Sequence, residues 1–219
     1  MPLDNYQQAH TFLGNGKKFL VIAGNREIGD AYPAALALTK TLRGNNKEAM
    51  LYTSGAIPEN FYFLDNPSSA LTNGPGRLKT IGIGQDVIVS IDASQTPIEK
   101  VSYKRSESHL NIYITPASGT IIKESNVHIS LSRFDCDAII TIGVDDLESL
   151  GEEFARNASL FYETPIINLD KNPSNERYGE VNLIEPTCSS CSEITTLLLK
   201  KWGEGLIKKE IATSLLAGI

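Results

Sequence analysis

The sequence has little cysteine and little positive charge, and both shortages narrow the classes of protein to which it can belong. Three cysteines among 219 residues are too few, and odd in number, for a disulfide framework, so we expect a reducing, cytoplasmic environment. With 20 Lys and Arg against 26 Asp and Glu, the net charge of −6 argues against extended binding to DNA. This balance is still compatible with a single nucleotide held in a local basic pocket.

Long apolar runs and known nucleotide fingerprints are also missing. No stretch approaches the ~20 residues that span a bilayer, and residues 1–6 lack the basic start of a signal peptide. We therefore expect no contact with a membrane. Gly24 and Gly29 flank a strand-to-helix turn, but the Gly-Lys-Ser/Thr ending of a phosphate loop is absent. None of the three His residues follows an expected buried strand, so no general base is evident among them.

What the sequence does contain is an alternation of apolar runs with helical patterns. The runs that predict strands buried on both faces are 19–23, 49–53, 86–92, 137–143 and 165–170. The patterns that predict helices cover 4–13, 30–42, 147–161, 189–203 and 207–217. This alternation predicts an α/β fold, a mostly parallel five-stranded sheet with helices on both faces.

Two further segments interrupt this alternation. Residues 55–80 predict a long connection with a short helix after Pro67. Residues 101–105 and 110–115 alternate apolar with polar side chains, which predicts an antiparallel hairpin with one face in water. We expect this hairpin as an insertion, about residues 97–132, at one edge of a single domain covering residues 1–219. Its exposed edge is a candidate surface for a homo-dimer.

Carboxylates follow several of the expected strands. Ligands of parallel sheets bind beyond the carboxyl ends of the strands, where Asp30, Asp170 and either Asp145 or Asp146 would converge. Clustered carboxylates raise one another's pKa unless a cation joins them, and a pair of Mg²⁺ or Mn²⁺ ions suits phosphoryl chemistry. Some of these carboxylates could instead have structural roles. Asp30 and Asp146 are placed to cap helices, and Asp92 to anchor the loop before the hairpin.

Cys188-Ser-Ser-Cys191 lies at the start of an expected helix, where a thiol can become redox-active. The surrounding sequence has neither a thioredoxin-like context nor a second pair of zinc ligands. Packing of small residues at a helix start is the reading we prefer.

Residues 167–182 carry the most specific pattern, Ile-Asn-Leu-Asp-Lys-Asn-Pro-Ser-Asn-Glu-Arg-Tyr-Gly-Glu-Val-Asn. This stretch resembles the signature loop of the DHH phosphoesterase family, in its oligoribonuclease- and bisphosphonucleotide-phosphatase-like branch. Residues 19–38 and 137–151 resemble the first and second motifs, so the resemblance covers almost the whole chain. It implies two manganese ions in a shell of His and Asp ligands. It also implies a second, substrate-binding domain, which we expect to be absent from this chain.

The resemblance also predicts that most of the metal ligands are replaced. The His and Asp positions that are lost fall on Gly24, Ile28, Gly143, Lys171 and Asn172. Asp30 and Asp170 remain as the retained metal positions, with Asp145 as a candidate replacement. Lys171 places a fixed positive charge where the family has a His that serves a cation.

Two functions are compatible with this pattern, beside a third reading as an unrelated α/β domain. The first is a degenerate DHH domain without a cofactor or metal-dependent hydrolysis, which acts as a nucleotide- or phosphate-binding or scaffold module. The residues expected to hold the anion are Lys171, Asn172, Arg177 and Arg26. The second is a Mn- or Mg-dependent phosphoesterase that acts on short oligonucleotides or nucleotide phosphates. The residues of its rebuilt site would be Glu27, Asp30, Asp145, Asp170 and Asn172.

Overall fold

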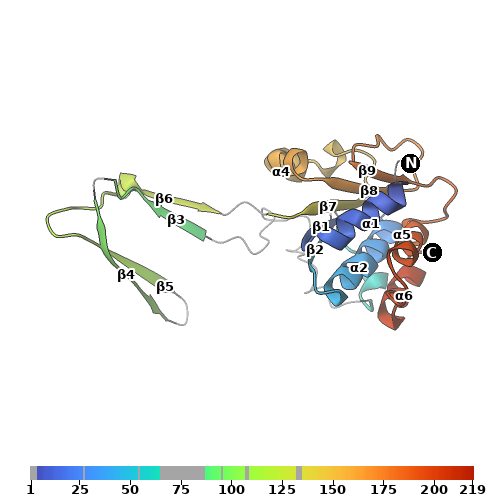
Figure 1. Ribbon diagram of the computed structural model, residues 1–219, viewed down its shortest axis with the longest axis horizontal. Helices are drawn as coiled ribbons and strands as arrows, with labels where there is room; N and C mark the ends of the chain where they lie inside the picture. Colours follow the sequence, from blue (N-terminus) through green and yellow to red (C-terminus); the bar gives the residue numbers. More distant parts are fainter. Residues whose placement is uncertain are drawn as a thin grey trace. The chain divides into compact units, whose positions relative to one another are not determined.

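The computed structural model describes residues 4–26, 28–53, 55–64, 87–94, 96–106, 109–131 and 135–219. They belong to two compact units, Met1–Ile83 with Asp135–Ile219 and the shorter Gly84–Phe134. The larger unit carries the parallel sheet, and the smaller unit carries two antiparallel strand pairs (Figure 1). The helix predicted after Pro67 and the side chain of Glu27 lie outside the described residues.

The larger unit is built on five parallel strands in the order β2-β1-β7-β8-β9. Their bounds are β1 Lys18–Ala23, β2 Glu48–Thr53, β7 Ala138–Ile142, β8 Ile166–Asp170 and β9 Val181–Ile184. Every residue of β7 and β8 is buried, as the continuous apolar runs predict for central strands of a parallel sheet. The predicted α/β fold with a parallel five-stranded sheet is confirmed.

The prediction was wrong about one member of that sheet. The run at 86–92 forms β3 (Val87–Ile91), which pairs antiparallel with β6 (Val127–Leu131) in the smaller unit. The fifth strand of the parallel sheet is β9, whose four residues pair with β8. An apolar run indicates an extended segment but not its partner, because partner choice depends on contacts distant in sequence.

Helices cover the sheet and form the core with it. Those that contribute to the main core are α1 Asn5–Asn15, α2 Ile28–Gly44, α5 Cys191–Trp202 and α6 Lys209–Ala217. The core takes alternate strand residues, such as Val21, Ile140 and Leu169, because successive side chains of a strand point to opposite faces. The helix predicted over 147–161 is broken into a 3-10 turn, α3 Glu152–Arg156 and α4 Ala158–Glu163.

The connections define where a ligand would bind. The connection through α2 leads from β1 to its neighbour β2 at one edge of the sheet. The connection through α3 and α4 leads from β7 to β8, towards the other edge. Right-handed crossovers in opposite directions place their helices on opposite faces of the sheet. A crevice therefore opens between the carboxyl ends of β1 and β7, the usual ligand position in such folds. None of the described helices is long and apolar enough to cross a membrane.

The smaller unit contains the predicted hairpin. β4 (Ile98–Arg105) pairs antiparallel with β5 (Leu110–Pro116), and β3 and β6 form the second pair. Asp92 accepts hydrogen bonds from the backbone N–H and the hydroxyl of Ser94. These bonds anchor the loop between β3 and β4, as the sequence predicts for Asp92. Among the residues of this unit whose exposure is described, only Thr96 is buried.

Because the two units differ in burial, an Ile→Ala substitution should lower the free energy of unfolding by different amounts in each. Ile140→Ala, in the core of the larger unit, should lower the free energy of unfolding by about 2–5 kcal/mol, because it leaves a cavity among fully buried side chains. Ile121→Ala, at a side chain that is 77% exposed, should change it by less than about 0.5 kcal/mol. Urea unfolding followed by far-UV circular dichroism, to which both units contribute, checks both variants, and equal losses would contradict this assignment of the core.

Candidate functional site

A cavity of about 270 Å³ lies at the carboxyl end of the parallel sheet, beside the start of α5. Its charged and amide-bearing lining residues are Arg26, Asp145, Asp170, Lys171 and Asn172. They follow three different strands, β1, β7 and β8, and meet because parallel strands end at the same edge. The structure thus brings together most of the residues that the sequence singles out, although they span 146 positions of the chain.

Asp170 is the last residue of β8 and is almost fully buried. Its Oδ1 accepts the backbone N–H of Asn172 at 3.0 Å, and its Oδ2 accepts the side-chain amide of Asn175 at 2.8 Å. Burial raises the pKa of Asp170, and the neighbouring Asp145 adds to this shift, which the two hydrogen bonds only partly offset.

Asp145 lies beyond β7 with a more hydrated carboxylate. Its Oδ1 accepts the side-chain amide of Asn172 at 2.7 Å, and its Oδ2 forms an ion pair with the Arg26 guanidinium. Partial burial opposes its ionisation, but the hydrogen bonds from Asn172 and Arg26 outweigh burial and lower the pKa of Asp145. The two neighbouring carboxyl groups therefore have pKa values shifted in opposite directions.

Asp30 connects two helices rather than capping its own. α2 begins at Ile28, so Asp30 lies inside the first turn, and its prediction as the N-cap of this helix was wrong. Its Oδ1 accepts the backbone N–H of Cys191, at the start of α5, at 2.7 Å. Its Oδ2 lies 3.0 Å from the ammonium group of Lys171. Asp30 is thus paired with a protein cation.

The 171–180 loop carries the remaining candidates. The Lys171 ammonium also lies 3.4 Å from the carbonyl oxygen of Ser189, and its side chain is 28% exposed. Arg177 is not among the residues that line the cavity. It adopts a φ of 56°, and its backbone N–H donates to Asn175 Oδ1 at 2.8 Å. The structure therefore groups Lys171 and Asn172 with Arg26 and leaves Arg177 at the exposed end of the loop.

A buried amide network supports this loop, and residue patterns alone gave no role to its members. Asn168, within the apolar strand β8, donates to Asn175 Oδ1 at 2.7 Å, and Asn175 donates to the Val144 carbonyl oxygen at 2.8 Å. The Tyr178 hydroxyl donates to the Thr141 hydroxyl at 2.8 Å. An Asn inside an otherwise apolar strand is the one sequence signal for this network, since buried amides require partners.

Two glycines form the floor of the crevice, where the resemblance places a His and an Asp. The Gly24 N–H donates to the Ile142 carbonyl oxygen at 2.8 Å, and a Cβ on Gly24 would lie 1.8 Å from the carbonyl oxygen of Gly143. Gly143 has a φ of 64°, and a Cβ there would lie 3.0 Å from Ala31 Cβ. Neither position accommodates a side chain without movement of the backbone.

These residues do not fit the pair of divalent ions that the motif resemblance implies. Within the described part of the chain, no three His, Cys, Asp or Glu side chains are grouped closely enough to hold a metal ion. Asp30 and Asp145 each contact a protein cation. A second cation at these oxygens would meet an ammonium or guanidinium group at close range.

The remaining candidates have structural roles. Asp146 Oδ1 accepts the Ser149 N–H at 2.6 Å beside the 3-10 turn Glu148–Leu150, whose N-cap residue is Leu147, so Asp146 stabilises this turn without being the N-cap of a helix. Cys188 and Cys191 line the cavity. Burial raises the pKa of both thiols, which makes them poor nucleophiles and agrees with the preferred packing interpretation.

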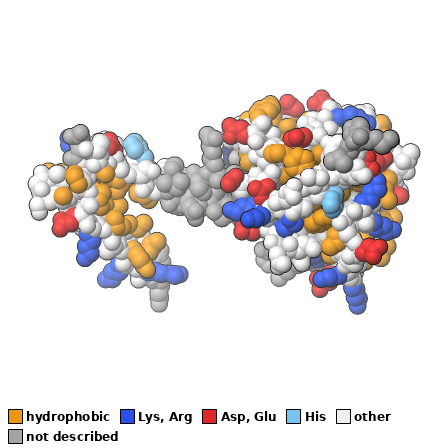
Figure 2. Space-filling model, in the orientation of Figure 1, with side chains coloured by type: hydrophobic (Ala, Val, Ile, Leu, Met, Phe, Trp, Pro, Cys, Tyr) orange, Lys and Arg blue, Asp and Glu red, His pale blue; other side chains and the backbone are white. Residues whose placement is uncertain are grey.

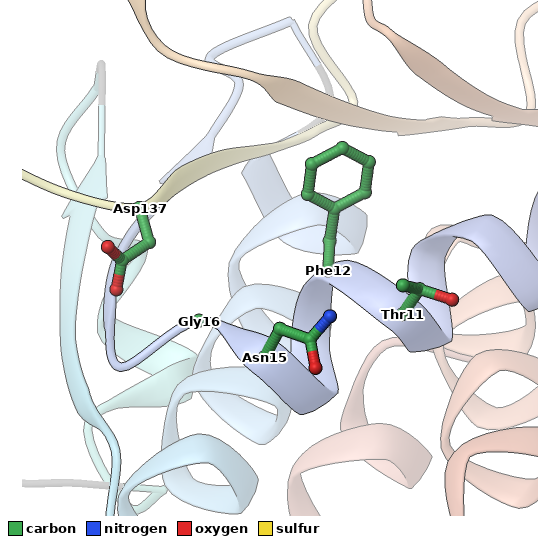
Figure 3. A pocket seen from close by; sticks show the side chains of 5 residues that line it. All are labelled: Thr11, Phe12, Asn15, Gly16 and Asp137. Atoms are coloured by element: carbon green, nitrogen blue, oxygen red, sulfur yellow. The ribbon is translucent and has the colours of Figure 1, made fainter.

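A second cavity, of about 320 Å³, lies near the amino ends of β1 and β7 (Figure 3). Asp137, one of its lining residues, accepts the backbone N–H groups of Lys17 and Lys18 at 2.6 and 2.8 Å. These hydrogen bonds lower the pKa of Asp137 and fix the chain before β1. The other lining residues are Thr11, Phe12, Asn15 and Gly16. Among the described residues that line this cavity, Asp137 is the only charged one, so we do not treat it as the functional site.

Comparison with known proteins gives a likeness of fold. No protein-family model and no curated protein matches the chain. A solved structure that does match is that of an exopolyphosphatase-related protein from Bacteroides fragilis, with a TM-score of 0.63 at 14% sequence identity. The match covers 97% of this chain and 48% of that protein, so this chain spans about half of its length. At this identity the likeness concerns the fold alone.

The glycine contact gives a prediction about stability. Gly24→Ala should lower the free energy of unfolding by about 2–4 kcal/mol, because the added methyl group must displace the Gly143 backbone. Gly14→Ala is the matched control, since it lies in α1 with nothing within 4 Å of the added Cβ, and it should be neutral or stabilise by up to about 1 kcal/mol. Denaturant unfolding compares the two variants, and equal effects would exclude the close contact.

The ion pair gives a prediction about titration. Arg26→Gln should raise the pKa of Asp145, because it removes a charged donor from Oδ2, whereas Arg177→Gln should leave it unchanged. Asp145 stabilises the fold above its unfolded pKa of about 3.9, and this contribution is lost as the pH falls through its lowered folded pKa. Carboxyl ¹³C shifts measured between pH 2 and 8 test this. An Asp145 midpoint that does not move in Arg26→Gln would rule out the pairing.

Proposed function

We propose that the larger unit is a phosphoesterase-like domain, related to the oligoribonuclease and bisphosphonucleotide phosphatase branch, that binds a phosphate-bearing ligand without hydrolysing it. The observation that carries this proposal is the Lys171 ammonium, 3.0 Å from the Asp30 carboxylate at the edge of the cavity. The fold neighbour's description as exopolyphosphatase-related supports a ligand with phosphate groups.

Loss of metal-dependent hydrolysis follows from what occupies the crevice. The backbones of Gly24 and Gly143 are in close contact. The resemblance places a His and an Asp at these two positions, and their side chains would need the space that the backbones fill. Lys171 and Arg26 supply fixed positive charges to Asp30 and Asp145, which would otherwise attract divalent ions. Protein cations therefore take the electrostatic role that metal ions have in the family.

The same two cations supply donors to a phosphate. A guanidinium group carries five N–H donors and an ammonium group three, so each can bind a phosphate oxygen in addition to its carboxylate. The Arg26 side chain is 70% exposed, and Lys171 and Asn172 line the cavity beside it. An incoming phosphate would exchange the long contact of Lys171 with the Ser189 carbonyl oxygen for a charge-assisted hydrogen bond.

The carboxylates set a limit on affinity. Asp145 and Asp170 line the same cavity and repel an anion, although the raised pKa of Asp170 reduces its share of that repulsion. Two cations that are already paired supply less net attraction than two that are not. We therefore expect a dissociation constant of about 0.1–1 mM for a simple nucleoside monophosphate, rather than micromolar binding.

The proposal predicts metal-independent binding of AMP and inorganic phosphate. In the presence of EDTA, amide resonances of residues 171–172 should shift on titration, and Lys171→Gln should weaken binding at least 5-fold. Arg177→Gln, a charge loss in the same loop but outside the cavity, should leave affinity within 2-fold. Equal weakening by both variants would indicate non-specific attraction and contradict the assigned site.

Hydrolysis is tested separately. With Mn²⁺ or Mg²⁺ present, the purified chain should not cleave a model phosphodiester or a short oligonucleotide above the rate of the Asp30→Ala and Asp170→Ala double variant. Cleavage that is lost in the double variant would overturn the proposal.

A second candidate function is supported by the convergence of Asp145, Asp170 and Asn172 on one cavity. It is a Mn- or Mg-dependent phosphoesterase acting on short oligonucleotides or nucleotide phosphates, in which Lys171 and Arg26 would have to leave their carboxylates. Calorimetric titration with Mn²⁺ distinguishes the two functions. Tight binding that disappears in the double variant favours this candidate, and absence of binding up to millimolar Mn²⁺ favours the first.

A further inference from the structure

The β4–β5 hairpin is strongly amphipathic. Its register places Val101 opposite Ile114 and Tyr103 opposite Ile112, so these side chains share one face. Together with Leu110, which is on the same face as Ile112, they form a set that we call the hairpin apolar face: Val101, Tyr103, Leu110, Ile112 and Ile114. The opposite face carries mostly polar residues, among them Ser102, Lys104 and Asn111.

The hairpin apolar face is open to solvent within its unit. Tyr103 is 76% exposed, Val101 64%, Leu110 60% and Ile112 50%. Figure 2 shows hydrophobic side chains at the surface of this unit. An isolated two-stranded sheet is only marginally stable in water. In this unit, every apolar side chain whose exposure is described is at least partly exposed, so the two strand pairs share no buried core. An apolar face of this kind indicates an interaction surface.

We propose that the hairpin apolar face is a dimerisation surface, on which the same face of a second copy of this chain packs. The smaller unit has five basic and five acidic residues, so two copies of it do not repel each other. The same balance disfavours a polyanionic partner. Arg105, opposite Leu110, is the one charged residue on this face and lies at its end, so the apolar centre formed by Val101, Tyr103, Ile112 and Ile114 complements itself in a two-fold symmetric interface.

Face-to-face packing satisfies the hairpin better than pairing of its edges. Edge pairing between two β5 strands would extend the sheet but leave the apolar face in water. Stacking two hairpins about 10 Å apart buries both faces between them. Each face offers on the order of 400 Å² of apolar surface, about half of the ~800 Å² per partner in a standard interface. This area is at the low end for specific association, so we expect a weak dimer with a dissociation constant of about 10–100 μM.

The test is the mass of the 219-residue chain as a function of concentration. Sedimentation equilibrium from about 1 to 100 μM should show a rise from 23.9 kDa towards twice that mass. Ile112→Lys should raise the dissociation constant at least 10-fold, because it places a charge in the centre of the interface. Asn111→Lys introduces the same charge on the opposite face of the same strand and should leave the constant within 2-fold.

A second readout keeps the test independent of misfolding. In dilute, monomeric samples the amide shifts of β4 and β5 away from the substituted residue should match the wild type in both variants, which shows that the hairpin remains folded. Trp202 fluorescence should also be unchanged, which shows that the larger unit is intact. Amide hydrogen exchange along β5 should slow with concentration in the wild type and not in Ile112→Lys. A chain that remains monomeric at 100 μM, or a dimer that Ile112→Lys leaves intact, overturns the proposal. Neither result depends on phosphate binding in the larger unit.

Discussion

The close approach of two backbones at the carboxyl ends of β1 and β7 constrains the whole crevice. A side chain on Gly24 would collide with the Gly143 backbone, and one on Gly143 would crowd Ala31 at a positive φ. The positions nearest the centre of the sheet therefore contribute only peptide groups. Charged side chains reach the cavity from the next residues outward, Arg26 after β1 and Asp145 after β7. Every electrostatic feature of the candidate site is built around this floor.

Two of the three carboxyl groups in the crevice are paired with cations of the protein itself. Lys171 faces Asp30, Arg26 faces Asp145, and Asp170 is buried among amide donors. Burial raises the pKa of Asp170, whereas hydrogen bonds and an ion pair lower that of Asp145, so one region holds two carboxyl groups of different acidity. A site that neutralises its own carboxylates has less need of metal ions, which is the physical basis for proposing binding without hydrolysis.

The two units meet the demands of folding in different ways. The larger unit buries alternate residues of five strands under helices and so forms a core of its own. The smaller unit has strand pairs with regular register but leaves its large apolar side chains exposed. Hydrophobic burial is the main favourable contribution to folding, so a unit without a described core points to a partner. This contrast is the reason for assigning ligand binding to one unit and association to the other.

Much of this organisation follows from the sequence alone. The apolar runs of β1, β7 and β8 specify strands buried on both faces, because only side-chain polarity is needed to predict burial. The 167–182 pattern likewise predicts a strand that ends in Asp170 and is followed by a polar loop with Lys171 and Asn172 at its start. Tertiary structure alone decided that β3 joins β6 rather than the parallel sheet, that Asp30 accepts the Cys191 N–H, and that Arg177 lies outside the cavity. Those outcomes depend on which distant segments come into contact, and such contacts are set by packing of the whole chain rather than by local residue patterns.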